Sequence, residues 1–441
     1  MNKEITLKTR REFLRTSVLG GALSWTVPAF LANTFSAMQA EAAATATQVA
    51  TGRDSNILVI LQMAGGNDGL NTIVPYSNDH YHRARPRLGL PEKRILKIND
   101  EIGLHENLAG FKDLYDAGQL SIIQGVGYPN PNRSHFRSTE IWQTAADAEK
   151  IESSGWLGRY FDNTCSGCEP TVAVNIGRQM PQAFQAKHPV GVSLESPQSY
   201  RFMSREKGKS GEMTEESYRK LNEPDGEMAE NAGGTIGAIH GSVQAPGSAL
   251  DFLERTALDA QLSSDKIRAI ANRVENQATY PASQLGNSLK LVAKLIGGGL
   301  ATRVFYVSQG GYDTHTNQTA AHERLLKELG DSVKAFVADL KAQGNLSRVL
   351  VMTFSEFGRR VAENASSGTD HGAAAPMFLI GDKVKAALLG KYPSLAPSDL
   401  FQGDLKYNLD FRSVYAGVLE NWLKTKSAPI LGRQFSPLQI I

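Results

Sequence analysis

Short apolar runs without polar alternation recur along this chain and predict buried strands. They span residues 56–61, 120–125, 303–308, 349–354 and 376–381. A strand that is covered on both faces has no solvent side, so its pattern lacks the usual alternation of apolar and polar positions. The runs therefore favour a largely parallel sheet that lies between helices.

Between these runs, apolar residues recur at steps of three and four, which is the spacing of an amphipathic helix. The longest stripe covers 320–340, and similar spacing marks 108–117, 248–274 and 411–423. Strands and helices that alternate in this order predict a doubly wound α/β fold. A chain of roughly 400 residues holds one large α/β domain or two smaller ones, and we expect 46–441 to form a single domain.

One segment does not follow this alternation of strands and helices. Residues 201–241 are rich in lysine, glutamate, glycine, serine and asparagine and contain few large apolar side chains. This composition buries little apolar surface and favours a surface excursion. With the helical patterns that follow, the range of about 200–295 predicts an insertion. It is either a cap or lid over the strand ends or a solvated segment without a catalytic part.

The N-terminus has the pattern of a twin-arginine signal peptide over residues 1–45. Arg10 and Arg11 precede a Phe-Leu pair and a weakly apolar stretch. Ala40 and Ala42, on either side of a glutamate, fit a small-residue cleavage site, and Ala43 and Ala44 allow alternatives. An ordinary basic amphipathic N-terminus is the alternative. Glycine, proline and asparagine interrupt the apolar stretch, so we expect no stable membrane span after cleavage. The pattern predicts a periplasmic or secreted protein that the twin-arginine machinery exports.

The charge balance argues against a polyanionic partner. The formal net charge is +2 at pH 7, and this value includes the basic N-terminus. We therefore expect no nucleic acid partner, and a small molecule or a polymer is left as the substrate.

The two cysteines of the chain are Cys165 and Cys168. In an oxidising exported setting this spacing permits a short-loop disulfide, which we expect as a structural link. Free thiols are the second interpretation. A redox centre would need the pair at the start of a helix, and Gly167 and Pro170 indicate a loop instead.

Acidic and imidazole side chains gather in glycine-rich loops next to the predicted strands. These loops span 65–69, 310–315, 355–360 and 368–372. In an open parallel sheet, loops at the carboxyl ends converge, and carboxylates with neutral imidazoles suit divalent Zn, Mn, Mg or Ca. The candidate metal ligands are Asp68, Asp313, His315, Asp370 and His371. For each of them a simpler role stays open, namely a turn former, a helix cap or a hydrogen-bonded structural imidazole.

The loop after the second predicted strand supplies candidate catalytic groups. Ser134 stands at the start of a helical pattern, where it either attacks as a nucleophile or serves only as an N-cap. His135 is a candidate ligand or acid, and Glu356 is a candidate ligand or general base. Arginine holds oxyanions through two parallel hydrogen bonds, and the candidates for this role are Arg133, Arg137 and Arg359.

Five ordered motifs behind the twin-arginine pattern resemble the bacterial domain-of-unknown-function family 1501. They occupy 65–71, 133–136, 310–318, 355–359 and 368–372. That family is itself similar, at a distance, to the alkaline phosphatase and sulfatase superfamily. The resemblance implies a three-layer sandwich around one mixed, mostly parallel sheet, with one or two metal ions at the strand ends. It names no substrate.

The resemblance to the superfamily is incomplete. Asp68 matches its first metal-binding aspartate, and Ser134 matches the position of its nucleophile. The superfamily then has an aspartate with a histidine four residues on, whereas here Asn317 takes that position and the imidazole is at His315. The adjacent Asp-His pair that follows is replaced by Glu356 and a phenylalanine, and the sulfatase signature around a modified cysteine is absent.

Two hypotheses follow from these features. The first is an exported metal-dependent hydrolase that acts on a phosphate or sulfate ester. The second is a non-catalytic exported binding or assembly protein that keeps the fold without a complete ligand set, because a fold does not by itself fix a function.

Overall fold

The computed structural model describes residues 55–441 except 166–167, 188–189, 201–215, 217–248 and 386. The predicted signal peptide and nearly all of the 201–241 segment lie outside the described residues.

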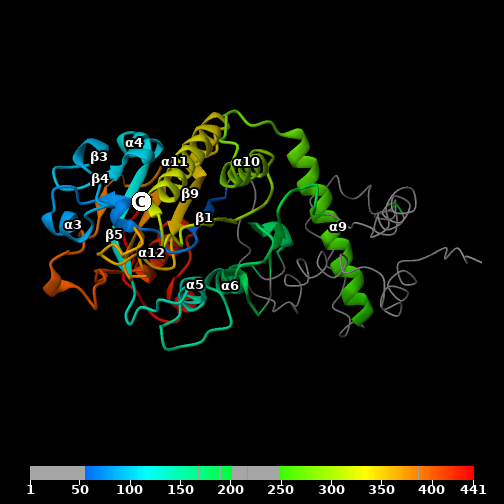
Figure 1. The fold of residues 1–441 in the computed structure, drawn as a ribbon. Helices are drawn as coiled ribbons and strands as arrows, with labels where there is room; N and C mark the ends of the chain where they lie inside the picture. The colour runs from blue at the N-terminus through cyan, green and yellow to red at the C-terminus, as the bar shows by residue number, and fades with distance from the viewer. Residues whose placement is uncertain (1–54, 166–167, 188–189, 201–215, 217–248, 386) are drawn as a thin grey trace, which may run out of the picture.

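A nine-stranded sheet forms the centre of the molecule (Figure 1). Its strands, in spatial order, are β11 (Leu388–Leu389), β5 (Leu120–Gly127), β10 (Ala375–Ile380), β9 (Val349–Phe354), β1 (Ile57–Met63), β8 (Val304–Gln309), β6 (Ala173–Ile176) and β7 (Val192–Leu194), with β12 (Leu409–Asp410) paired to β5. The five apolar runs of the sequence are the strands β1, β5, β8, β9 and β10.

Neighbouring strands are parallel except around β10. Strand β1 pairs in parallel with β8 and β9, and β6 pairs in parallel with β7 and β8. Strand β10 runs antiparallel to both β5 and β9. Every residue of β1, β5, β9 and β10 is buried, which explains why these strands lack polar alternation. The mostly parallel sheet that we expected is confirmed.

Helices cover both faces of this sheet. The odd-numbered residues of β1 pack in one apolar cluster and Leu58 and Ile60 in another, so the two faces of the strand belong to different cores. The first layer contains α4 (Ala109–Asp116), α10 (Gln284–Gly297) and α11 (Gln318–Ala342). The second contains α5 (His135–Thr144), α6 (Trp156–Thr164) and α12 (Phe411–Gly417). Figure 1 shows the two layers above and below the strands, which is the expected three-layer sandwich.

The remaining described elements lie around this sandwich. A small antiparallel sheet contains β2 (Ile73–Val74), β4 (Gly103–His105) and β3 (Ile95–Lys97), close in the chain to α3 (Asp79–Ala84). Helix α9 (Ala249–Arg273) contacts α10, and a π-helical turn (Val418–Trp422) and α13 (Ala428–Leu431) follow α12. Of the range expected as an insertion, α10 packs on α11 and β8 as part of the first layer. None of the described helices combines the length and apolar character needed to cross a membrane.

Two local features bear on the expectations above. Cys165 and Cys168, at the end of α6, are joined by a disulfide. The predicted helices at 108–117, 320–340 and 411–423 correspond to α4, α11 and the pair formed by α12 and its π-helical turn.

The direction of β10 brings one more loop to the candidate site. The carboxyl ends of β1, β8 and β9 open at one edge of the sheet, where ligands of such sheets bind. Because β10 is reversed relative to β9, the loop that precedes it opens at that same edge. Strand β5 is reversed relative to β10, so its carboxyl end and the start of α5 are also there.

Candidate metal centre

Glycines allow the loops at this edge to lie in direct contact. Gly65, after β1, has φ of +121°, and a Cβ there would lie 2.5 Å from the amide nitrogen of Asp313. A Cβ at Gly368 would lie 2.2 Å from the carbonyl carbon of His315. Such distances exclude a side chain, so these glycines are required for the loops after β1 and β8 and before β10 to meet.

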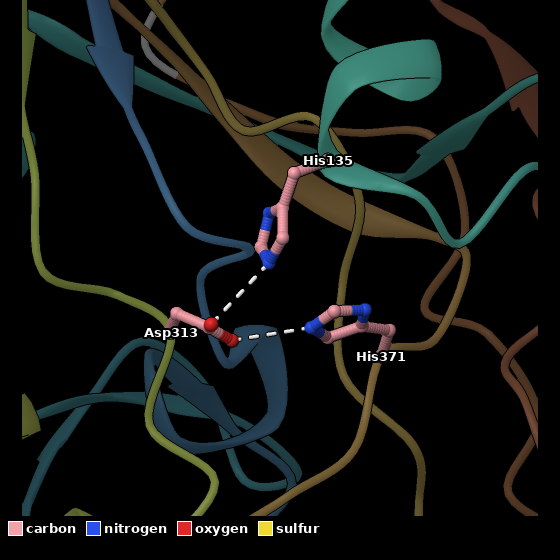
Figure 2. A group of neighbouring side chains, drawn as sticks. All are labelled: His135, Asp313 and His371. Carbon is pink, nitrogen blue, oxygen red and sulfur yellow. Dashed lines mark hydrogen bonds and ion pairs between the residues drawn. The ribbon is translucent and has the colours of Figure 1, made fainter.

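Three of the side chains singled out in the sequence meet in one group, which we call the metal centre: His135, Asp313 and His371. One donor atom from each lies within 4.8 Å of the others. His135 Nε2 is 3.4 Å from Asp313 Oδ2, and His371 Nε2 is 3.1 Å from Asp313 Oδ1. Figure 2 shows both imidazoles directed at the carboxylate from two different elements. His135 comes from the first turn of α5, and His371 comes from the loop before β10.

The hydrogen bonds of His371 define which of its nitrogens carries a proton. Its Nδ1 lies 2.8 Å from the backbone carbonyl oxygen of Arg133. A carbonyl only accepts, so the neutral imidazole donates from Nδ1 and has a lone pair at Nε2. That lone pair points at Asp313.

The same argument applies to His135. Its Nδ1 lies 2.9 Å from Oε1 of Glu356, which also accepts the Gly65 N–H at 2.8 Å. The ionised carboxylate only accepts, so His135 donates from Nδ1 and its Nε2 has a free lone pair. Among the described residues, this buried Nε2 has no hydrogen-bond partner. Glu356 therefore lies outside the metal centre and orients one of its imidazoles.

The third group is a carboxylate that stays charged. Burial acts to raise the pKa of Asp313, but the hydrogen bond from Arg359, at 2.8 Å, leads the opposing interactions and the pKa is lowered to about 2. When both imidazoles are neutral, their Nε2 lone pairs face this anion and the three donors repel one another, whereas a proton on Nε2 makes the same distances ion pairs. A divalent cation bound between the three groups would remove this repulsion. Two imidazoles with one carboxylate are ligands that suit zinc and related ions. The residues therefore fit a divalent metal.

His315 lies beside the metal centre on its exposed flank. Its Nε2 is 3.0 Å from Asp313 Oδ1 and 2.9 Å from His371 Nε2, and its Nδ1 is 3.3 Å from Oδ1 of Asp370. Asp370 is held in turn by Asn364 Nδ2 at 3.1 Å, a hydrogen bond that lowers the pKa of Asp370. His315 thus brings a fourth nitrogen to the centre, while Asp370 contacts that histidine and is not one of the grouped donors.

Asp68 is not brought into the centre. Its side chain is fully buried and pairs with Arg85, whose Nη1 lies 2.6 Å from Oδ2. Burial acts to raise the pKa of Asp68, but the charge of Arg85 and its hydrogen bond hold the pKa below its usual value. The side chain of Gln318 also donates to Asp68 Oδ2, at 2.5 Å. The structure thus places this candidate ligand in the protein interior, where it forms an ion pair with Arg85.

Gln318 connects that buried pair to the loops of the metal centre. Its Oε1 accepts from the hydroxyl of Thr314 at 3.1 Å and from that of Thr369 at 2.6 Å. These threonines are neighbours in sequence of the histidine and aspartate side chains described above. Gln318 stands within one of the five motifs, but no signal in the sequence points to this connecting role.

Ser134 is the N-cap residue of α5 and is exposed. Its side chain makes no capping hydrogen bond, and its backbone N–H donates to Oδ1 of Asn132 at 2.8 Å. The hydroxyl therefore does not have the capping function that was the alternative to a nucleophile, and it lies one residue before His135.

The three arginines considered for anion binding already have protein acceptors. Arg359 is buried and donates to the carbonyls of Gly65, Gly66, Tyr312 and Thr369 and to Asp313. Arg137 donates to carbonyls of residues 147, 148 and 150 and pairs with Glu140. Arg133 pairs with Asp404. Arg359 is thus a residue that holds the β1 and β8 loops and the candidate ligand Asp313 in place.

These observations define an α/β sandwich with a candidate His-His-Asp metal centre at the carboxyl edge of its sheet. The model of a protein family of unknown function, DUF1501, matches residues 55–431, so the chain belongs to this family. The family membership expected from the five motifs is thereby confirmed. No curated protein matches the chain significantly.

Solved structures with a similar fold include members of the expected superfamily. A protein of the alkaline phosphatase superfamily from Vibrio parahaemolyticus has 9% identity and a TM-score of 0.35, and the match covers 92% of this chain and 78% of that one. A sulfatase from Pseudoalteromonas sp. has 11% identity and a TM-score of 0.32, covering 86% and 68%. The zinc complex of the C-terminal periplasmic domain of EptC from Escherichia coli has 9% identity and a TM-score of 0.31, covering 77% and 78%.

Proposed function

We propose that this protein is an exported metal-dependent hydrolase of a phosphate or sulfate ester. The observation that carries the proposal is the convergence of Nε2 of His135 and Nε2 of His371 on the charged carboxylate of Asp313. Both imidazoles donate their Nδ1 protons elsewhere, His135 to Glu356 and His371 to the Arg133 carbonyl. Metal-ligating histidines are commonly oriented in this way by an acceptor on the second nitrogen.

His135, Asp313 and His371 would hold a divalent ion, and His315 would add its Nε2 as a fourth donor. An ion bound there would polarise an ester oxygen and lower the pKa of water. In the overall reaction, the oxygen of a water bonds to phosphorus or sulfur, the bond to the leaving oxygen breaks, and the proton that the water loses ends on the released alcohol. If Ser134 attacks first, its hydroxyl proton goes to the released alcohol, and water then cleaves the serine ester and restores the hydroxyl. Zinc, manganese, magnesium and calcium all remain candidates for this donor set.

The chain supplies further groups for this reaction. The exposed hydroxyl of Ser134 lies next to His135 in the sequence and, as it does not cap α5, is available as the nucleophile; water is the other candidate. Glu356 serves as the residue that fixes the ring of His135, rather than as a ligand. Export would use the twin-arginine pathway, which the pattern at Arg10 and Arg11 supports.

One observation favours the second hypothesis, a binding or assembly protein without catalysis. Arg133, Arg137 and Arg359 all donate to protein acceptors, and the side chain of Arg359 is fully buried, so these arginines are already engaged in holding the fold. The two hypotheses differ in activity, and only the hydrolase requires a bound metal ion.

The test combines metal analysis with hydrolysis. Untagged protein would be analysed for bound metal and assayed with p-nitrophenyl phosphate and p-nitrophenyl sulfate. We expect a stoichiometric divalent ion and turnover of one ester, with both lost in His371→Ala and Asp313→Ala and retained in the exposed-histidine control His82→Ala. Bound metal without turnover of either ester would support the binding protein, and a folded protein that retains no divalent ion would contradict the proposal.

A further inference from the structure

Two arginines share one buried carboxylate at the rim of the metal centre. Asp404 is fully buried, and Arg133 Nε lies 2.8 Å from its Oδ2. Arg360 approaches the other oxygen, with Nε 3.8 Å from Oδ1, which is too long for a hydrogen bond. Asp404 therefore pairs directly with Arg133 and makes only a longer ion pair with Arg360, without a hydrogen bond.

Arg360 differs from Arg133, Arg137 and Arg359 in that its guanidinium has only the long contact with Asp404. Its side chain is 40% exposed, whereas that of Arg359 is fully buried. Within the part of the chain that the structure describes, the guanidinium of Arg360 makes no hydrogen bond. An arginine presents five N–H donors in a planar fork, so this fork is available to a ligand.

The backbone places Arg360 opposite Asp370, in the loop next to the metal centre. Arg359 and the ligand His371 form an antiparallel bridge, and the Arg360 N–H donates to the Asp370 carbonyl at 3.0 Å. Asp370 in turn contacts His315. The side chain of Arg360 therefore begins one residue from a bridge that contains a metal-centre histidine.

The charges around the centre favour an anionic ligand once a cation is bound. Four carboxylates and three guanidiniums surround it: Asp313, Glu356, Asp370 and Asp404, with Arg133, Arg359 and Arg360. With neutral imidazoles, this set has one excess negative charge, and a divalent ion changes the excess to one positive charge. An oxyanion at the exposed flank would then be attracted by the whole site.

We infer that Arg360 is the residue that binds the oxyanion of the substrate, and that this substrate is a phosphate or sulfate ester. The inference rests on the proposed function. The planar fork of Arg360 would take two oxygens of the tetrahedral group, as arginine does with phosphates. The anion-holding role considered for Arg133, Arg137 and Arg359 passes to a residue that sequence analysis did not select.

The experiment measures binding of inorganic phosphate and of inorganic sulfate to the zinc-loaded full chain by titration calorimetry. The variants are Arg360→Gln and Arg360→Lys, and the control is Arg178→Gln, an exposed arginine paired with Glu195. We expect Arg360→Gln to weaken binding of the preferred anion at least tenfold while zinc content stays unchanged. Arg360→Lys should recover part of the affinity, because lysine restores the charge without the fork. In the ester assay, KM should rise more than kcat falls.

Unchanged anion affinity in zinc-loaded Arg360→Gln would overturn the inference, as would a zinc-loaded wild type that binds neither anion. The proposed function fails separately. If the wild type binds phosphate through Arg360 but turns over no ester, the anion site stands and the hydrolase is excluded.

Discussion

Replacing Glu356 tests how far the metal centre depends on an oriented imidazole. Its Oε1 is buried and accepts two N–H groups, from Gly65 and from Nδ1 of His135. Glu356→Ala removes both acceptor contacts, so the His135 ring loses the partner that keeps the proton on Nδ1. Loss of such a partner typically weakens metal binding by about 10- to 100-fold, which is about 1.4–2.7 kcal/mol. Glu356→Gln retains one acceptor oxygen, so we expect a smaller loss.

The assay is competition for Zn²⁺ with a chromophoric chelator, after circular dichroism has shown that each variant is folded. Glu420→Gln is the matched control, because Glu420 also accepts from a backbone N–H and a side chain, both of Ser427. The control should bind zinc like the wild type. Wild-type zinc affinity in a folded Glu356→Ala protein would refute the argument that this carboxylate prepares His135 for the metal.

Two further predictions concern buried groups behind the centre. Asp68→Asn leaves the buried guanidinium of Arg85 without its counter-charge. Urea unfolding should therefore show that the free energy of unfolding falls by about 3–5 kcal/mol, while the zinc content stays the same. Loss of zinc at unchanged stability would instead make Asp68 a ligand. His322 is buried, and burial lowers its pKa to about 4, below the usual value near 6.5. The stability that the neutral His322 contributes to the folded state is therefore complete above about pH 6.5, and it declines by about 3 kcal/mol as the pH falls toward 4. His322→Gln should flatten that part of the stability curve, and an unchanged slope would contradict the assignment.

The strands and helices were predictable because their signal is local. The apolar run of β1 and the apolar stripe along α11 show which residues are buried, whichever element covers them. That the glycine-rich loops meet was predictable for a different reason, because parallel strands bring their carboxyl ends to one edge. The reversed direction of β10 has no such local signal, and the placement of His371 beside Asp313 depends on it.

The partners of the charged groups could not be read from the sequence. Asp68 follows a strand in a glycine-rich loop as Asp313 does, yet one pairs with Arg85 in the interior and the other faces two imidazoles. The acceptor of His371 is a backbone carbonyl, which has no sequence signature. Arg359 and Arg360 are adjacent, but the fold buries only the first. Such distinctions depend on tertiary contacts rather than on residue type or spacing.

The most direct test of the metal centre is anomalous diffraction from crystals of the full mature chain grown with Zn²⁺ or Mn²⁺. We predict one strong peak bounded by Nε2 of His135, Nε2 of His371 and the carboxylate of Asp313, at roughly 2.0–2.2 Å from each donor. A well-ordered structure in which this position has no anomalous peak, with both imidazoles in the same orientation, would contradict the account.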